Sequence, residues 1–277
     1  MKVIECRTIA EAHAKLVNYV FWNGQKMITE DGQSCIEAEP VTVTIHNPVS
    51  DNNDDWINPN SPAQIQKVIA YIEQIFKGAS GFEYTYHERL MEYSRRNGNC
   101  NSAIVSCAIN DLRTLTSRTD LPIGVIDKLK SVVFDLGIAE DQLFDDEEPV
   151  NQIDLIVDHL TDELFTRRAV AITWYPWVDP ATQHVPCLQW MQFKVRKQRF
   201  GFLLWLIGRK PILDMYLLMR SEDVAGAFGQ NVAGFATLLQ YVAQKIDCAV
   251  GKYEHIVTIP HMYPTTNAEE IKRMTKC

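Results

Sequence analysis

The chain has 277 residues, of which 46% are apolar and 22% charged, and its formal net charge is −8 at pH 7. This length and apolar content are enough for one large domain with a substantial core, or for two smaller ones. The acidic balance argues against the basic surface of a protein that binds duplex nucleic acid, and no apolar run reaches the ~18–20 residues of a membrane span. The opening residues lack the basic-then-apolar pattern of a secretion signal, so we expect a cytoplasmic protein (in the host cytoplasm if the source is viral).

The amino-terminal part predicts two helices with a turn and a strand between them. Residues 7–22 carry apolar side chains at helical spacing. Residues 28–35 are typical of a turn, and the alternation in residues 39–48 is typical of a strand. Residues 61–77 begin with a Ser-Pro start signal and precede a glycine, which predicts a second helix.

The stretch 92–150 differs in character from its surroundings. It predicts two short helices and ends in an acidic run at 145–149, which we interpret as a solvated loop. We expect one domain over residues 1–277, with 92–150 as an inserted helical lobe.

The carboxyl-terminal part predicts further helices and strands in mixed order. Helices are expected at 153–164 and 231–246, a buried strand at 169–174, and strands at 187–195 and 255–263. The fold class is therefore α+β, with a mixed or mainly antiparallel sheet packed with helices.

The seven cysteines are scattered and form no CxxC pair, and the histidines show no spacing typical of metal ligands. We therefore expect no zinc site and no disulfide framework, and interpret most of the cysteines as reduced thiols.

Four groups of residues could carry chemistry: the pair Arg167-Arg168, the thiol of Cys187, the stretch 220–223 followed by Asn231, and the pair His261 and Tyr263. Each has an ordinary explanation as surface charge, core packing, a helix cap or edge-strand polarity. Together they describe a nucleotide site. Guanidinium and hydroxyl groups cradle phosphate, an amide can pair with uracil, and a thiolate is a strong nucleophile.

These motifs resemble those of the thymidylate synthase family, which includes the pyrimidine nucleotide hydroxymethylases. The resemblance covers about half of the chain and rests on NQID, TRRAVAITW, PCLQWMQF, MRSEDVAGAFGQN and PHMY, which occur in that order. The stretch FEYTYHERL resembles a segment of a short, archaeal-like branch of the family.

The resemblance implies the following roles. Cys187 would add to C6 of the pyrimidine, with Tyr86 as a site tyrosine and Glu73, or else Glu88, as the catalytic glutamate. Arg220 and Ser221 would hold the nucleotide phosphate, Asp223 the folate ring, Asn231 the base, and His261 with Tyr263 the ribose. Arg167 and Arg168 would reach across from a second subunit, which implies a homodimer with shared sites. The one-carbon donor would be 5,10-methylene-tetrahydrofolate or a related methylene-pterin, with no metal, nucleic acid or membrane involved.

The resemblance also suggests the substrate. Relatives specific for deoxycytidylate have an aspartate where this chain has Asn231, so dUMP is expected. The chain ends soon after Tyr263, whereas typical synthases continue into a tail that closes the site. We therefore expect water to reach the site and hydroxymethyl-dUMP to be the product. The alternatives are a thymidylate synthase that makes dTMP, a dCMP or CMP hydroxymethylase, and a non-catalytic nucleotide-binding protein.

Overall fold

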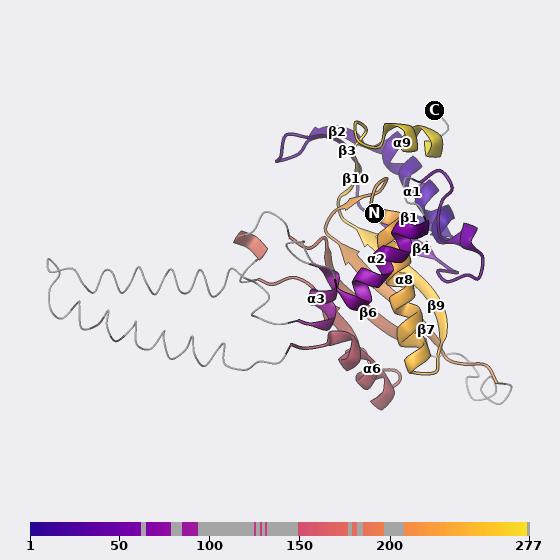
Figure 1. Cartoon of the computed structure of the whole chain (residues 1–277), viewed down its shortest axis with the longest axis vertical. Helices are drawn as coiled ribbons and strands as arrows, with labels where there is room; N and C mark the ends of the chain where they lie inside the picture. Colours follow the sequence, from indigo (N-terminus) through magenta and orange to yellow (C-terminus); the bar gives the residue numbers. More distant parts are fainter. Residues whose placement is uncertain are drawn as a thin grey trace.

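A computed structural model describes residues 1–61, 65–78, 85–93, 149–176, 179–181, 185–196 and 208–275, together with three isolated positions, 125, 128 and 131. Its centre is a six-stranded sheet in the order β1-β4-β9-β7-β6-β5 (Figure 1). These strands are β1 (Lys2–Cys6), β4 (Val41–Ile45), β9 (Ala249–Val257), β7 (Ile212–Met219), β6 (Leu188–Arg196) and β5 (Val170–Ile172). The pairs β1–β4 and β7–β9 are parallel and the other pairs antiparallel, so the sheet is mixed.

Helices pack against this sheet. Helix α1 (Ile9–Asn23) contacts β1 and β4, α8 (Phe228–Lys245) contacts β7 and β9, and α2 (Ile65–Lys77) packs against α8 (Figure 1). The shorter helices are α3 (Tyr86–Met91), α6 (Gln152–Asp162) and α9 (Ala268–Thr275), with 3-10 turns at η1 (Asn53–Asp55) and η3 (Asp179–Ala181). The core lies between the sheet and helices α1 and α8, where alternate side chains of β7 are fully buried.

A second, four-stranded sheet brings distant segments to one place. Its order is β2-β3-β10-β8, with β2 (Gln25–Ile28), β3 (Ser34–Glu37), β10 (Pro260–Met262) and β8 (Glu222–Asp223). In it His261 pairs with Asp223 and with Glu37. The sheet therefore places the segment after β7 beside the PHMY stretch and the β2–β3 hairpin.

The structure confirms the α+β class with a mixed sheet, and most of the predicted elements. Helices α1, α6 and α8, and strands β4 and β6, lie where the sequence predicts them. Helix α2 also lies within its predicted range, although its Ser-Pro start falls partly outside the described residues. The predicted lobe at 92–150 lies almost wholly outside them.

Three expectations are corrected. The predicted strand 255–263 is two strands, because the chain leaves the large sheet after Val257 and joins the small one at Pro260. The predicted buried strand at 169–174 is an edge strand, and Val170 and Ile172 are 42% and 45% exposed. Asn231 does not cap α8, because that helix begins at Phe228. The prediction also missed β1, the β2–β3 hairpin and α9, which are short or exposed.

Candidate active site

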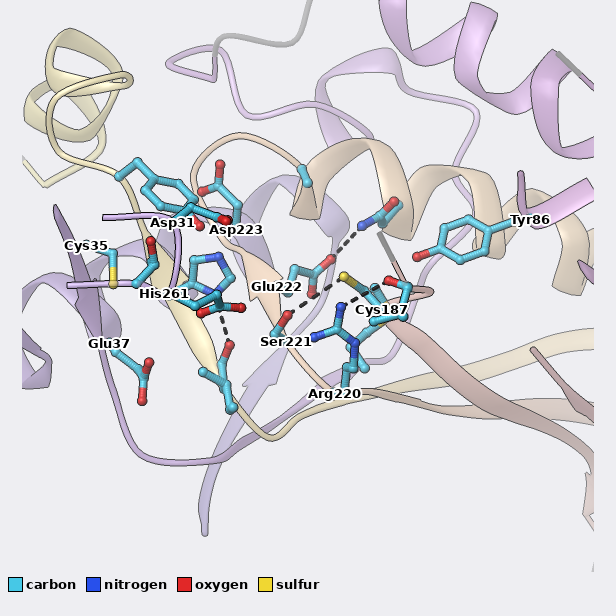
Figure 2. A pocket seen from close by; sticks show the side chains of 18 of the residues that line it. Asp31, Cys35, Glu37, Tyr86, Cys187, Arg220, Ser221, Glu222, Asp223 and His261 are labelled. Atoms are coloured by element: carbon cyan, nitrogen blue, oxygen red, sulfur yellow. Dashed lines mark hydrogen bonds between the residues drawn. The ribbon is translucent and has the colours of Figure 1, made fainter. Parts of the chain in front are cut away.

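A cavity of about 850 Å³ lies where the small sheet meets the amino-terminal end of α8. The predicted site residues that line it are Tyr86, Cys187, Arg220, Ser221, Asp223, Asn231, His261 and Tyr263. They come from α3, from the residue before β6, from the segment between β7 and α8, from the first turn of α8, and from the region of β10 (Figure 2). Segments far apart in the sequence thus meet at one cavity.

Cys187 lies immediately before β6, beside an irregularity in the sheet. The pairing of β6 with β7 shifts between Leu188 and Trp190, and bulges of this kind redirect neighbouring side chains. The Cys187 sulfur lies 3.7 Å from the hydroxyl oxygen of Ser221 (Figure 2). Burial raises the pKa of the Cys187 thiol, while the Arg220 charge and the Ser221 hydroxyl act in the opposite direction. The thiol is therefore protonated at rest, and these two groups favour its thiolate.

Arg220 holds the chain on both sides of the thiol. Its Nε donates to the carbonyl oxygen of Pro186 at 3.1 Å, and its Nη2 donates to that of Val185 at 3.0 Å. The backbone N–H of Arg220 donates to the carbonyl oxygen of Cys187 at 2.8 Å. A guanidinium has five N–H donors, so three of them form no hydrogen bond with the described residues and could bind an anion in the cavity.

Tyr86 approaches the same place from α3. Thr85 caps this helix in a capping box that engages the Glu88 carboxylate, and the box fixes the orientation of the first turn. The Tyr86 hydroxyl accepts a hydrogen bond from the backbone N–H of Leu188 at 3.3 Å, so it lies next to the cysteine (Figure 2). The second candidate for the catalytic glutamate, Glu88, thus serves as a helix cap.

Asp223 shapes the loop that leads into α8. One carboxylate oxygen accepts from the backbone N–H groups of Ala225 and Gly226 at 3.2 and 3.1 Å, and any side chain at Gly226 would collide with this carboxylate. Burial raises the pKa of Asp223. Its neighbours His261 and Tyr263 lie edge to face, with ring centroids 5.2 Å apart. The two rings line one side of the cavity and offer the imidazole nitrogens and the phenol hydroxyl as polar groups.

Asn231 lies in the first turn of α8 and is 8% exposed. Its Nδ2 donates to Glu222 Oε1 at 2.9 Å, and its Oδ1 accepts from the hydroxyl of Tyr71. The sequence analysis missed both partners. Glu222 was visible inside the RSED motif, but no pattern in the sequence marks it as buried. Tyr71 belongs to the helical pattern of α2, where a core position is the ordinary interpretation.

Three further predicted residues, like Glu88, do not line this cavity. Glu73 is exposed on α2 and pairs with Lys77 at 3.3 Å, an i,i+4 surface ion pair. Arg167 and Arg168 are exposed between α6 and β5 and do not line the cavity.

The charge of the cavity is unbalanced. Among the described residues that line it, Arg220 is the only arginine or lysine, whereas the carboxylates are Glu30, Asp31, Glu37, Glu222 and Asp223. Three of these carboxylates, Glu30, Asp31 and Glu37, come from the β2–β3 hairpin. A dianionic phosphate would therefore need further cations.

Within the described part of the chain, no group of three or more His, Cys, Asp or Glu residues is arranged to hold a metal ion, and no helix could cross a membrane.

Comparison with known proteins supports the interpretation of the motifs. A family model described as "Thymidylate synthase" matches residues 105–276. The chain is 26% identical over 265 residues to a Methanococcoides burtonii protein named "Putative thymidylate synthase", covering 95% of this chain and 89% of that protein. A protein of the same name from Methanocaldococcus jannaschii is 25% identical over 279 residues, covering 99% of this chain and 96% of that protein. A Haloferax volcanii protein named "Thymidylate synthase" is 27% identical over 118 residues, covering 43% of this chain and 31% of that protein.

Proposed function

Because the chain belongs to the thymidylate synthase family, it is a one-carbon transferase, and we propose that it acts at C5 of dUMP. The observation that carries this proposal is the position of the Cys187 thiol. It lies in a cavity that also presents the Arg220 guanidinium, the Ser221 hydroxyl and the Asn231 amide. A nucleophile, a group for phosphate and a group for the base are thus within one site.

In the proposed reaction, Cys187 loses its proton to water in the open cavity and its sulfur forms a bond to C6 of the uracil. The electron pair of the C5–C6 double bond then delocalises towards O4, and an N–H of Asn231 stabilises the negative charge there. C5 becomes a nucleophile and bonds to the one-carbon unit. Loss of the C5 proton to water then supplies the electron pair that re-forms the C5–C6 double bond and breaks the sulfur–C6 bond, and the released thiolate regains a proton. Arg220 stabilises the thiolate and binds phosphate oxygens through the N–H groups that the backbone does not use.

The cavity has room for the donor. Its volume of about 850 Å³ is at the upper end of the range of small-molecule sites, roughly 300–1,000 Å³. The carboxylate of Asp223 would accept N–H bonds from a pterin ring, while His261 and Tyr263 would hold the ribose of dUMP. When bound, a methylene-tetrahydrofolate supplies the one-carbon unit.

We further propose a homodimer with shared sites. The lining of the described cavity is rich in carboxylates, and Arg220 alone would not neutralise a phosphate dianion. Arg167 and Arg168 are exposed and outside their own cavity, so they are free to enter that of a second copy. A site completed in this way would have three guanidinium groups around the phosphate.

Two products are compatible with this site. The names of the relatives favour dTMP. The exposed β2–β3 hairpin at the rim of the cavity favours entry of water, which would give the hydroxymethyl-dUMP expected from the sequence.

The deciding experiment incubates the protein with 5-tritiated dUMP and methylene-tetrahydrofolate and determines the mass of the nucleotide product. A methyl product with dihydrofolate identifies a synthase, and a hydroxymethyl product with tetrahydrofolate identifies a hydroxymethylase. Binding of dUMP without release of tritium would instead indicate a non-catalytic nucleotide-binding protein.

A further inference from the structure

A chain of buried hydrogen bonds leads from the core of the sheet to the base-reading amide. The Tyr253 hydroxyl lies 2.7 Å from His255 Nδ1, and His255 Nε2 lies 2.6 Å from Glu222 Oε2. The other oxygen of Glu222 accepts from Asn231 Nδ2 at 2.9 Å, and on the far side of the amide the Tyr71 hydroxyl donates to Asn231 Oδ1. The side chains of Glu222 and His255 are 0% exposed. Figure 2 shows Glu222 between the thiol and the start of α8.

The direction of each hydrogen bond follows from the donor chemistry. A carboxylate only accepts, so His255 Nε2 and Asn231 Nδ2 must both donate to Glu222. Burial raises the pKa of Tyr253 well above its usual value, so this phenol keeps its proton and can donate to His255. The Tyr71 hydroxyl donates to Asn231 Oδ1. Rotating the Asn231 amide by half a turn would therefore set its oxygen against the Glu222 carboxylate.

We propose that Glu222 is a specificity-determining residue that locks the amide of Asn231 in one orientation and thereby selects the pyrimidine. This inference rests on the proposed function. The locked amide keeps one N–H donor and one oxygen lone pair for a ligand, and the positions of this donor and this acceptor cannot be exchanged. Uracil presents an acceptor, O4, next to the donor N3–H, whereas cytosine presents the amine donor next to the acceptor N3. An amide free to rotate would serve both bases, but a locked amide serves one.

The test measures equilibrium binding of dUMP and of dCMP to the full chain without folate. The variant Glu222→Gln replaces the carboxylate by an amide. Its oxygen can accept from His255, which turns its NH₂ group towards Asn231 and favours the reversed amide. We expect the dUMP-to-dCMP affinity ratio to fall by about tenfold or more and to move towards dCMP, because hydrogen bonds to a charged group are among the stronger ones.

The matched control is Asp214→Asn, which removes another fully buried carboxylate, on β7, that pairs with Arg196 and does not line the cavity. Its affinity ratio should equal that of the wild type, whatever its effect on stability. If Glu222→Gln does not fold, Tyr71→Phe removes the other anchor of the amide and should lower the ratio several-fold.

Three outcomes are informative. An unchanged ratio in Glu222→Gln, or in Tyr71→Phe where that variant is used, overturns the lock. Equal binding of dUMP and dCMP by the wild type also overturns it. Binding of neither nucleotide by the wild type would instead count against the proposed function.

Discussion

Replacing Cys187 by serine separates the chemistry from nucleotide binding. The sulfur lies 3.7 Å from the Ser221 hydroxyl, and the cavity around it is formed by groups that the substitution leaves in place. A serine hydroxyl is smaller and neutral, so it should disturb neither Arg220 nor Asn231. Its proton is far harder to remove than that of a thiol, and nothing described beside it is placed to act as a strong base.

The magnitude of the two effects should differ greatly. Loss of a covalent nucleophile typically removes most of the rate, and we expect release of tritium to fall by about a thousandfold or more. Binding of dUMP should change by less than about tenfold, that is, by less than ~1.4 kcal/mol, because the phosphate and base contacts do not involve the sulfur.

Two assays on one preparation give both numbers: release of tritium from 5-tritiated dUMP with methylene-tetrahydrofolate, and equilibrium dialysis with dUMP alone. Release by Cys187→Ser at a rate near that of the wild type would refute the proposed nucleophile. Loss of dUMP binding in a folded variant would refute the separation of roles that the geometry implies.

Three further predictions concern the pH dependence, the sharing of sites between subunits, and stability. Because burial raises the pKa of Cys187, the thiolate is scarce at neutral pH, so tritium release should rise as the pH increases from about 6 to 9; a flat profile would show that forming the thiolate does not limit the rate. A homodimer with shared sites predicts that Cys187→Ser and the double variant Arg167→Ala/Arg168→Ala, each inactive alone, regain about a quarter of wild-type activity when coexpressed, since half of the dimers are mixed and each has one intact site. No recovery from a verified mixed dimer would contradict the sharing. Finally, Asp179→Ala leaves the buried Arg89 guanidinium without the carboxylate that it contacts at 2.8 Å, so the free energy of unfolding measured in urea should fall by about 3 kcal/mol or more, whereas Glu73→Ala at the exposed pair should change it by less than ~1 kcal/mol.

Sequence patterns predicted those helices and strands whose burial follows their own local periodicity along the whole element. Helix α8 carries large apolar residues at helical spacing, among them Val232, Phe235 and Leu239, and β6 alternates cleanly over part of its length, so both were found. Strand β10 was merged with β9, because the break at Thr258 and Ile259 reflects which sheet each strand joins. That choice depends on pairing with β3 and β8, which local periodicity does not encode.

The site residues divide in the same way, into those that a local motif reveals and those whose role depends on the tertiary structure. The motif residues Cys187, Arg220 and Asn231 could be found because their order along the chain resembles a known pattern. Glu222 could not, because its role depends on full burial and on contact with His255, 33 positions away. The resemblance suggested Glu73 as the catalytic glutamate, but Glu73 is exposed on α2, and hydrophobic periodicity favours Tyr71 and Ile75 for the inward face of that helix.

The position of Glu222 also explains how a carboxylate can orient the Asn231 amide without contacting the base itself. A carboxylate fixed by His255 is an acceptor on both oxygens, so its effect passes to the ligand only through the N–H groups of Asn231. Negative charge that develops on O4 would meet an N–H donor polarised by Glu222 behind it, rather than the carboxylate itself. The arrangement separates two requirements. In the proposed arrangement, the buried anion sets the direction of the amide, and the amide alone faces the base. A site built in this way can keep an acidic residue close to an anionic substrate without direct repulsion, provided that Arg220 and the arginines proposed to come from a second subunit neutralise the phosphate.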